Sequence, residues 1–216
     1  MKSDAVWPSI DLERAALSEE LGSLDESDWT TPSLCAGLSV REVLAHMTVS
    51  GAVAGPRWFL GVLRARFDFD RQVVDRLQEQ LGSDPHDTLA RFRSTLGSRT
   101  SPPLPVLALL GEMVVHGEDI RRPLGLRRDY PRPTLDALVR YYAGTDQVVI
   151  AKKRVAGLRL ESSDSGMTIG QGELVRGGSL ALIMAMTGCG AYCAELSGPG
   201  ASVLAGRCAR DSRERG

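Results

Sequence analysis

The chain has 216 residues, a formal net charge of −1 and a hydrophobic fraction of 43%, which is typical of a globular protein with a full core. The charge balance argues against a nucleic-acid-binding protein, because no excess of positive charge is present to neutralise phosphates. No apolar run approaches the roughly 18 to 20 residues of a membrane span, and the polar N-terminus MKSDAVWPSIDLERA is unlike a secretory signal. We therefore expect a cytoplasmic protein that binds neither nucleic acid nor membrane.

Up to about residue 150, apolar residues recur at helical spacing, and Gly, Pro and Ser separate the segments. Ser39 and Glu42 are spaced as a capping box, which marks the start of one helix near residue 39. Five helices are predicted, at residues 11–23, 38–67, 86–99, around 112–116 and at 132–151.

After residue 150 the spacing of apolar residues changes from helical to alternating. The stretch GLRLESSDSGMTIGQGE (157–173) alternates and is interrupted by Asp164, Ser165 and Gly166, which predicts a hairpin. GGSLALIMAMTG (177–188) is typical of a short buried helix, ASVLAGR (201–207) is expected to close the small sheet, and the charged tail is expected to fray. The predicted domains are a helical bundle over residues 1–150 and a small α+β domain over residues 151–216.

A carboxylate and an imidazole lie four residues apart in an apolar segment, at Glu112 and His116. On a helix they share one face and are close enough to hold a single ion. His46 lies seven residues into the capped helix, whereas His86 follows Pro85 in a polar segment and is expected at the surface. Two histidines and a carboxylate suit a divalent ion such as zinc. The alternatives without a metal are that Glu112 and His116 form a chance pair on the helix surface and that His46 is a hydrogen-bonded core residue.

The four cysteines form no CxxC pair. Cys189 and Cys193 would share a helix face, either as small core residues or as a metal or redox pair. Cys35 precedes the capped helix and Cys208 lies in the tail. Sequence position places no cysteine beside the three candidate ligands, so none is an obvious built-in nucleophile.

Two segments, SLCAGLSVREVLAHM (33–47) and GEMVVHGEDIRRPLG (111–125), resemble the mycothiol-dependent maleylpyruvate isomerase family. That family is part of a wider DinB-like group of four-helix metalloproteins. The resemblance implies a mainly α fold, with a DinB-like four-helix bundle followed by a small α+β C-terminal domain, to which residues 157–188 are similar. It also implies that His46, Glu112 and His116 bind a divalent metal, with Zn²⁺ as the expected ion.

The activity that the resemblance implies is isomerisation of, or S-transfer to, a small electrophile, with mycothiol as the thiol cosubstrate. The alternative is a non-catalytic or regulatory metal-binding protein of the same fold. Cys189 stands where relatives frequently carry an arginine, which is a departure that bears on thiol binding. The expected assembly is a monomer or a homodimer.

Three further residues are candidates for the site. Asp119, three residues after His116, is expected either to orient the His116 ring or to lie on the helix surface. Arg121 is expected to contact the last carbonyls of its helix or an anionic cosubstrate. Arg176, just before the apolar helix, is expected to face the cleft between the domains and to contribute to thiol binding and catalysis.

Overall fold

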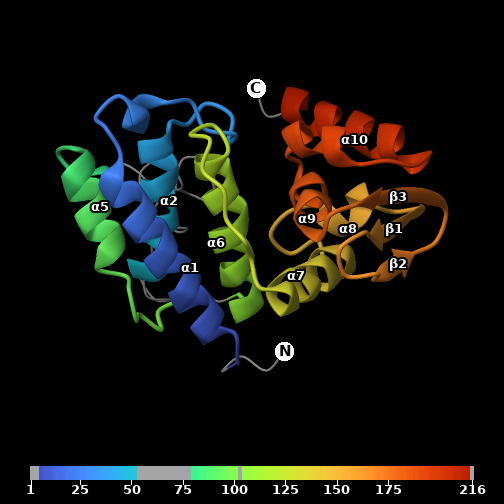
Figure 1. Ribbon diagram of the computed structural model, residues 1–216, viewed down its shortest axis with the longest axis horizontal. Coiled ribbons are helices and arrows are strands. Elements are labelled where there is room, and N and C mark those ends of the chain that lie inside the picture. Colours follow the sequence, from blue (N-terminus) through green and yellow to red (C-terminus); the bar gives the residue numbers. More distant parts are fainter. Residues whose placement is uncertain (1–4, 53–78, 102–103, 215–216) are drawn as a thin grey trace, which may run out of the picture. The chain divides into compact units, whose positions relative to one another are not determined.

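The computed structural model describes residues 5–52, 79–101 and 104–214 (Figure 1). The contacts within the chain divide it into two compact units, a first unit, Met1–Arg127, and a second unit, Arg128–Gly216. Within the described residues, no helix has both the length and the apolar character needed to cross a membrane.

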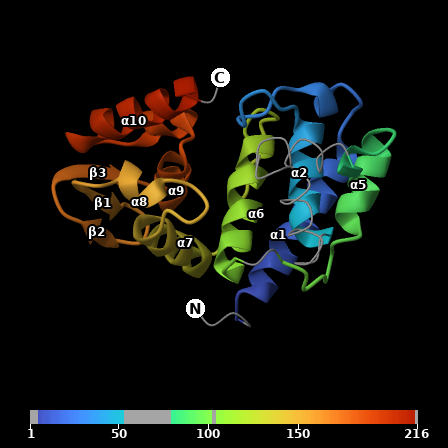
Figure 2. The same cartoon turned by 180° about the vertical axis from the view of Figure 1, so that it is seen from behind.

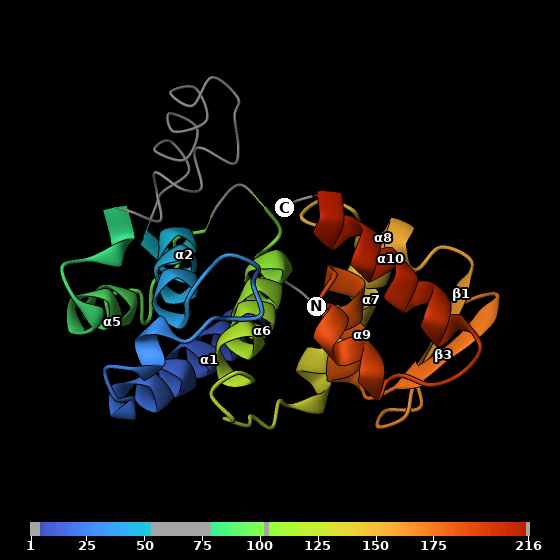
Figure 3. The same cartoon turned by 90° about the horizontal axis from the view of Figure 1, so that it is seen from above.

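In the described part of the first unit, four α-helices form a bundle, which can be followed in Figure 3. Helices α1 and α2 each pack against both α5 and α6, so each of these four helices has two neighbours among the others. The helices are α1 (Trp7–Glu20), α2 (Val40–Ala52), α5 (Pro85–Arg93) and α6 (Val106–Arg121), and two short 3₁₀ turns, η2 (Leu21–Ser23) and η3 (Asp28–Thr30), lie between α1 and α2. The predicted bundle is confirmed, while residues 53–67 of the predicted second helix lie outside the described residues.

Apolar side chains from all four helices fill the centre of the bundle, where water is excluded. Each helix contributes residues three, four or seven apart, as a stripe that faces a common core requires. They include Ile10 and Leu17 of α1, Leu44 and Met47 of α2, Leu89 and Phe92 of α5, and Leu110, Met113 and Val114 of α6.

The N-terminus of α2 has the predicted capping box. The backbone N–H of Ser39 donates to Glu42 Oε2 at 2.8 Å, and the Ser39 hydroxyl donates to the same oxygen at 2.7 Å. The Glu42 backbone N–H in turn approaches Ser39 Oγ at 3.4 Å. These contacts fix where α2 begins, and so they fix the turn on which His46 lies.

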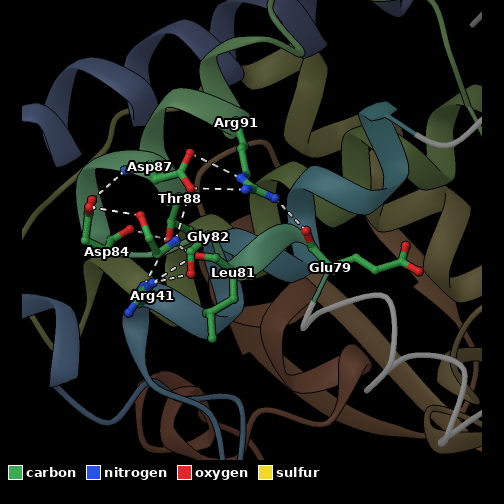
Figure 4. A network of polar contacts seen from close by, with 9 residues as sticks. Arg41, Glu79, Leu81, Gly82, Asp84, Asp87, Thr88 and Arg91 are labelled. Atoms are coloured by element: carbon green, nitrogen blue, oxygen red, sulfur yellow. Dashed lines mark hydrogen bonds and ion pairs between the residues drawn. The ribbon is translucent and has the colours of Figure 1, made fainter.

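A polar network joins α2 to the start of α5 (Figure 4). The Arg41 guanidinium donates to Thr88 Oγ1 at 2.9 Å and to the Gly82 carbonyl at 3.0 Å. Asp84 caps α5 by accepting a hydrogen bond from the Asp87 backbone N–H at 2.8 Å. One arginine of α2 thus binds the turn that opens α5, which holds the two helices in register.

The second unit is a small α+β structure, as predicted (Figure 2). Its sheet has the order β2-β1-β3, in which β1 pairs antiparallel with β2 and parallel with β3. Both α9 and α10 pack against β3, and α7 packs against α9. The elements are α7 (Arg132–Gly144), α8 (Ala151–Arg154), β1 (Leu158–Ser162), β2 (Thr168–Gly170), β3 (Glu173–Gly177), α9 (Ser179–Thr187), the 3₁₀ segment η4 (Gly190–Glu195) and α10 (Gly200–Glu214).

Two details of the second unit differ from the sequence analysis. The β1–β2 hairpin and the apolar helix α9 are confirmed, but residues 201–207 do not close the sheet, because they belong to α10. Leu204 and Cys208, four residues apart, are fully buried, and this helical spacing continues through a tail that we expected to fray. The third strand is instead β3, which follows the hairpin directly.

The boundary between the units also falls earlier than residue 150. The buried face of α7, which includes Leu138, Val139 and Tyr142, belongs to the second unit. The segment between α6 and α7 contains Pro123, Gly125 and Pro131, but similar breaks also separate helices within the first unit, so helical spacing on both sides did not identify this break as the division.

The capping box yields a stability prediction. Ser39→Ala should lower the free energy of unfolding by about 1 kcal/mol, because the N-terminal N–H groups of α2 lose a side-chain acceptor. Ser39→Thr, which keeps the hydroxyl, should stay close to the parent protein. Urea unfolding of both variants measures the difference, and equal losses in the two would contradict the assigned role of the hydroxyl.

Candidate metal centre

The three predicted ligands lie together within the first unit. His46 belongs to α2, and Glu112 and His116 belong to the neighbouring helix α6. His46 Nε2 is 3.9 Å from Glu112 Oε1, and the His46 and His116 rings have centroids 5.0 Å apart with planes at 86°. Their side chains keep 20–29% of their surface accessible. The cluster is therefore largely buried, with a partly exposed face.

The donor chemistry of these residues fits a zinc ion, and one of their distances is slightly long for it. Two donors that each lie about 2.0 to 2.2 Å from a tetrahedral ion are about 3.4 Å apart, and His46 Nε2 and Glu112 Oε1 are 3.9 Å apart. Two imidazoles and one carboxylate form a ligand set that zinc enzymes use with a fourth position left for water or substrate.

The contact expected between Asp119 and His116 is present. His116 Nδ1 donates to Asp119 Oδ2 over 2.9 Å, and only 7% of the Asp119 side chain is exposed. A carboxylate on one ring nitrogen fixes the ring orientation and leaves the other nitrogen to bind an ion. The backbone carbonyl of Asp119 also accepts a hydrogen bond from the Leu34 N–H at 3.0 Å, which ties the loop before α2 to α6.

That loop brings a residue to the site that the sequence analysis missed. Cys35 Sγ, a ring nitrogen of His116 and a carboxylate oxygen of Asp119 all lie within 4.8 Å of one another. The expectation that no cysteine lies beside the ligands is therefore wrong. Cys35 reaches His116 because Leu34 pairs with Asp119, an interaction between distant segments that leaves no mark on local spacing.

His116 consequently belongs to two possible donor sets. In the described part of the chain, only the set of Cys35, His116 and Asp119 has all its donor atoms within 4.8 Å of one another. The predicted set with His46 and Glu112 is more open, so its side chains must move slightly to meet around one ion.

The two neighbouring histidines have opposite pKa shifts. Burial lowers the pKa of His46 from 6.5 to about 4, and the adjacent His116 acts in the same direction. Burial also acts to lower the pKa of His116, but its hydrogen bond to Asp119 and the charges of Asp119 and Glu112 outweigh it and raise that pKa. His46 is thus neutral at pH 7, the state in which a ring nitrogen can coordinate metal.

A buried arginine on α1 contributes to the electrostatics of the cluster. The Arg14 side chain is fully buried, and its Nη1 donates to the carbonyls of Thr95 at 3.0 Å and Ser98 at 3.1 Å. Burial lowers the pKa of Arg14, whereas the charges of Asp11 and Glu112 raise it. A cation in the core therefore interacts with the carboxylate of the predicted metal site.

Arg121 is turned into the bundle. Its side chain has no exposed surface, and its Nε donates to Glu20 Oε2 at 2.6 Å. The guanidinium thus links the end of α6 to the end of α1. This contact favours a structural role for Arg121, because an incoming cosubstrate would have to displace Glu20 to reach it.

Arg176 lies on β3 in the second unit. Its Nε is 3.3 Å from Glu161 Oε1 on the paired strand β1, and 56% of its side chain is exposed. The guanidinium remains accessible to an anion, and its part in thiol binding and catalysis stays a prediction.

Comparisons with known proteins agree with the architecture. A family model described as the mycothiol maleylpyruvate isomerase N-terminal domain matches residues 10–121. A crystal structure of a histidine-to-alanine mutant of the mycothiol-dependent maleylpyruvate isomerase is similar at a TM-score of 0.66 and 12% identity, covering 93% of this chain and 94% of that one. A second crystal structure, of the mycothiol-dependent maleylpyruvate isomerase, is similar at a TM-score of 0.60 and 11% identity, with the same coverage. No curated protein matches significantly.

The lowered pKa of His46 leads to a pH prediction for the metal-free protein. Between pH 6.5 and about 4, the unfolded chain protonates this histidine and the folded protein does not. The free energy of unfolding should therefore fall as the pH drops through this window, by at most about 3 kcal/mol. Urea unfolding across the pH range measures this loss.

Matched variants isolate the contribution of His46. His46→Gln should remove the loss, and His86→Gln, at an exposed position, should retain it. The raised pKa of His116 contributes stability at low pH that is lost as the pH rises through that pKa, so it cannot mimic the effect. An unchanged pH profile in His46→Gln would refute the assignment.

Proposed function

Since the chain belongs to the family of the mycothiol maleylpyruvate isomerase N-terminal domain, we propose that it is a metal-dependent enzyme that uses mycothiol on a small electrophile. The reaction is isomerisation of a double bond conjugated with a carbonyl, or S-transfer. The observation that carries the proposal is the convergence of His46, Glu112 and His116 from two adjacent helices.

Each residue of the cluster has a defined part in this proposal. A zinc ion would supply Lewis acidity that lowers the pKa of a bound thiol, the source of the nucleophile. His46 offers a neutral ring nitrogen, His116 offers the ring nitrogen that Asp119 does not hold, and Glu112 offers a charged oxygen. Asp119 holds the His116 ring through Nδ1, and the partly exposed face of the cluster admits the thiol and the substrate.

A second candidate function is metal binding without catalysis. The compact set of Cys35, His116 and Asp119 supports it, because sulfur and nitrogen donors at short range are typical of structural zinc sites. The catalytic and the non-catalytic function require different residues around His116. Metal content and turnover of single variants can therefore separate them.

The proposed ligand set predicts the metal content of purified variants. The parent protein should hold about one zinc ion per chain, and His46→Ala and His116→Ala should lose most of it, since each removes one of three protein ligands. Glu112→Gln should weaken binding less completely, because the amide still offers an oxygen but no charge. Elemental analysis after dialysis against a weak chelator measures the content.

His86→Ala is the matched control for these variants, because it removes an exposed histidine outside the cluster. Cys35→Ala should keep its metal. Full metal content in both cluster-histidine variants would refute the site. Loss in Cys35→Ala together with retention in His46→Ala would transfer the site to the compact set.

The source of the nucleophile gives a kinetic prediction. With mycothiol as the nucleophile, conversion of maleylpyruvate should require both metal and added thiol, and Cys35→Ser should retain turnover within about tenfold. A spectroscopic assay with and without mycothiol measures this. If Cys35→Ser keeps its metal but loses all thiol-dependent turnover, Cys35 is the nucleophile. If the metal-loaded parent shows no thiol-dependent turnover of electrophiles, the non-catalytic function is favoured.

A further inference from the structure

A second thiol site lies in the second unit, where Cys193 Sγ and Cys208 Sγ are 3.8 Å apart. Cys193 belongs to η4 and Cys208 to α10, two segments that pack together. Cys193 is partly exposed and Cys208 is fully buried. The sequence spacing grouped Cys193 with Cys189, but the fold pairs it with a cysteine from the tail helix.

The separation of the two sulfurs is suited to disulfide formation. A disulfide has an S–S length of about 2.05 Å, so the 3.8 Å contact must close by roughly 1.8 Å.

The surroundings make Cys193 the more reactive thiol. The contact with Cys208 lowers the pKa of Cys193, and the charge of Arg154 acts in the same direction, against burial and the neighbouring Cys189. A lowered pKa increases the thiolate population, and the thiolate is the nucleophilic form. Cys193 thus combines partial exposure with thiolate character, while Cys208 stands behind it.

We propose that Cys193 and Cys208 form a redox-active dithiol, in which Cys193 reacts with a hydroperoxide and Cys208 completes a disulfide. The Cys193 thiolate attacks the terminal peroxide oxygen and the O–O bond breaks. The departing alkoxide takes a proton to become an alcohol, and Cys193 becomes a sulfenic acid. The Cys208 thiol then attacks the Cys193 sulfur, the S–O bond breaks and water leaves. In total the dithiol loses two electrons and two protons, and the hydroperoxide is reduced to an alcohol and water.

Oxidation would alter the hydrogen bonding at the end of α9. The Cys208 thiol donates to the Ala185 carbonyl at 3.3 Å, and Arg154 donates to the Met186 carbonyl. A disulfide has no S–H, so the Ala185 carbonyl would lose this donor, whereas the hydrogen bond from Arg154 to the Met186 carbonyl would remain. The redox state of the pair is thereby coupled to the last turn of α9. The inference is independent of the metal centre, since all these residues belong to the second unit.

The test treats the full-length protein with hydrogen peroxide and maps the products by mass spectrometry without reduction. The thiol count of the denatured chain should fall from four to two, with Cys193 joined to Cys208, and dithiothreitol should restore it. Cys189→Ser is the matched control, because it removes a nearby cysteine and should leave the bridge intact.

Two further variants separate the roles of the pair. Cys208→Ser should accumulate a sulfenic acid at Cys193 that dimedone traps, and Cys193→Ser should leave Cys208 as a thiol. If Cys208→Ser does not fold, trapping at Cys193 in the parent at short peroxide exposure provides the same readout. A Cys189–Cys193 bridge, or oxidation confined to Cys35, would overturn the proposal.

Discussion

The packing of α2 against α6 is the constraint on which the candidate site depends. Glu112 and His116 share a face of α6 through helix geometry alone, but an ion needs a further donor from another segment. His46 lies beside this pair only because α2 starts at a fixed residue and stays in register with its neighbours. The capping box sets the first of these conditions, and the contacts of Arg41 with the turn before α5 support the second.

Several ionisable side chains lie inside the bundle near the packing of α2 against α6. Asp119 stabilises the protonated form of His116, whereas burial keeps His46 neutral. Arg14 and Arg121 place two guanidinium groups inside the unit, one interacting with Glu112 and the other paired with Glu20. Buried charges are costly unless they are matched, so each of these guanidinium groups is stabilised by a carboxylate of the same unit.

The chemistry open to each cysteine depends on its neighbours in the fold. Cys35 lies against His116 and Asp119 in the first unit, where it is a possible ligand. Cys193 and Cys208 lie against each other in the second unit, where no histidine occurs and their chemistry is that of a dithiol. Cys189 stands near this pair and acts to raise the pKa of Cys193. The same side chain therefore supports metal binding at one place and redox chemistry at another.

Local spacing was sufficient to predict the helices of the bundle, the start of α2, the β1–β2 hairpin and the shared face of Glu112 and His116. Each of these features follows from hydrogen bonding and side-chain direction within about ten residues. The place of His46 in the capped helix made it a candidate third donor, and the resemblance of two short segments to a known family supported this choice, which stays a prediction. The assignment of α7 to the second unit, the helical state of residues 201–207, and the contacts of Cys35 and Cys193 were decided by the tertiary structure. They depend on which distant surface covers a given apolar face. The seven-residue segment ASVLAGR is compatible with both helical and strand spacing, and the burial of Leu204 and Cys208 in the core of the second unit selects the helix.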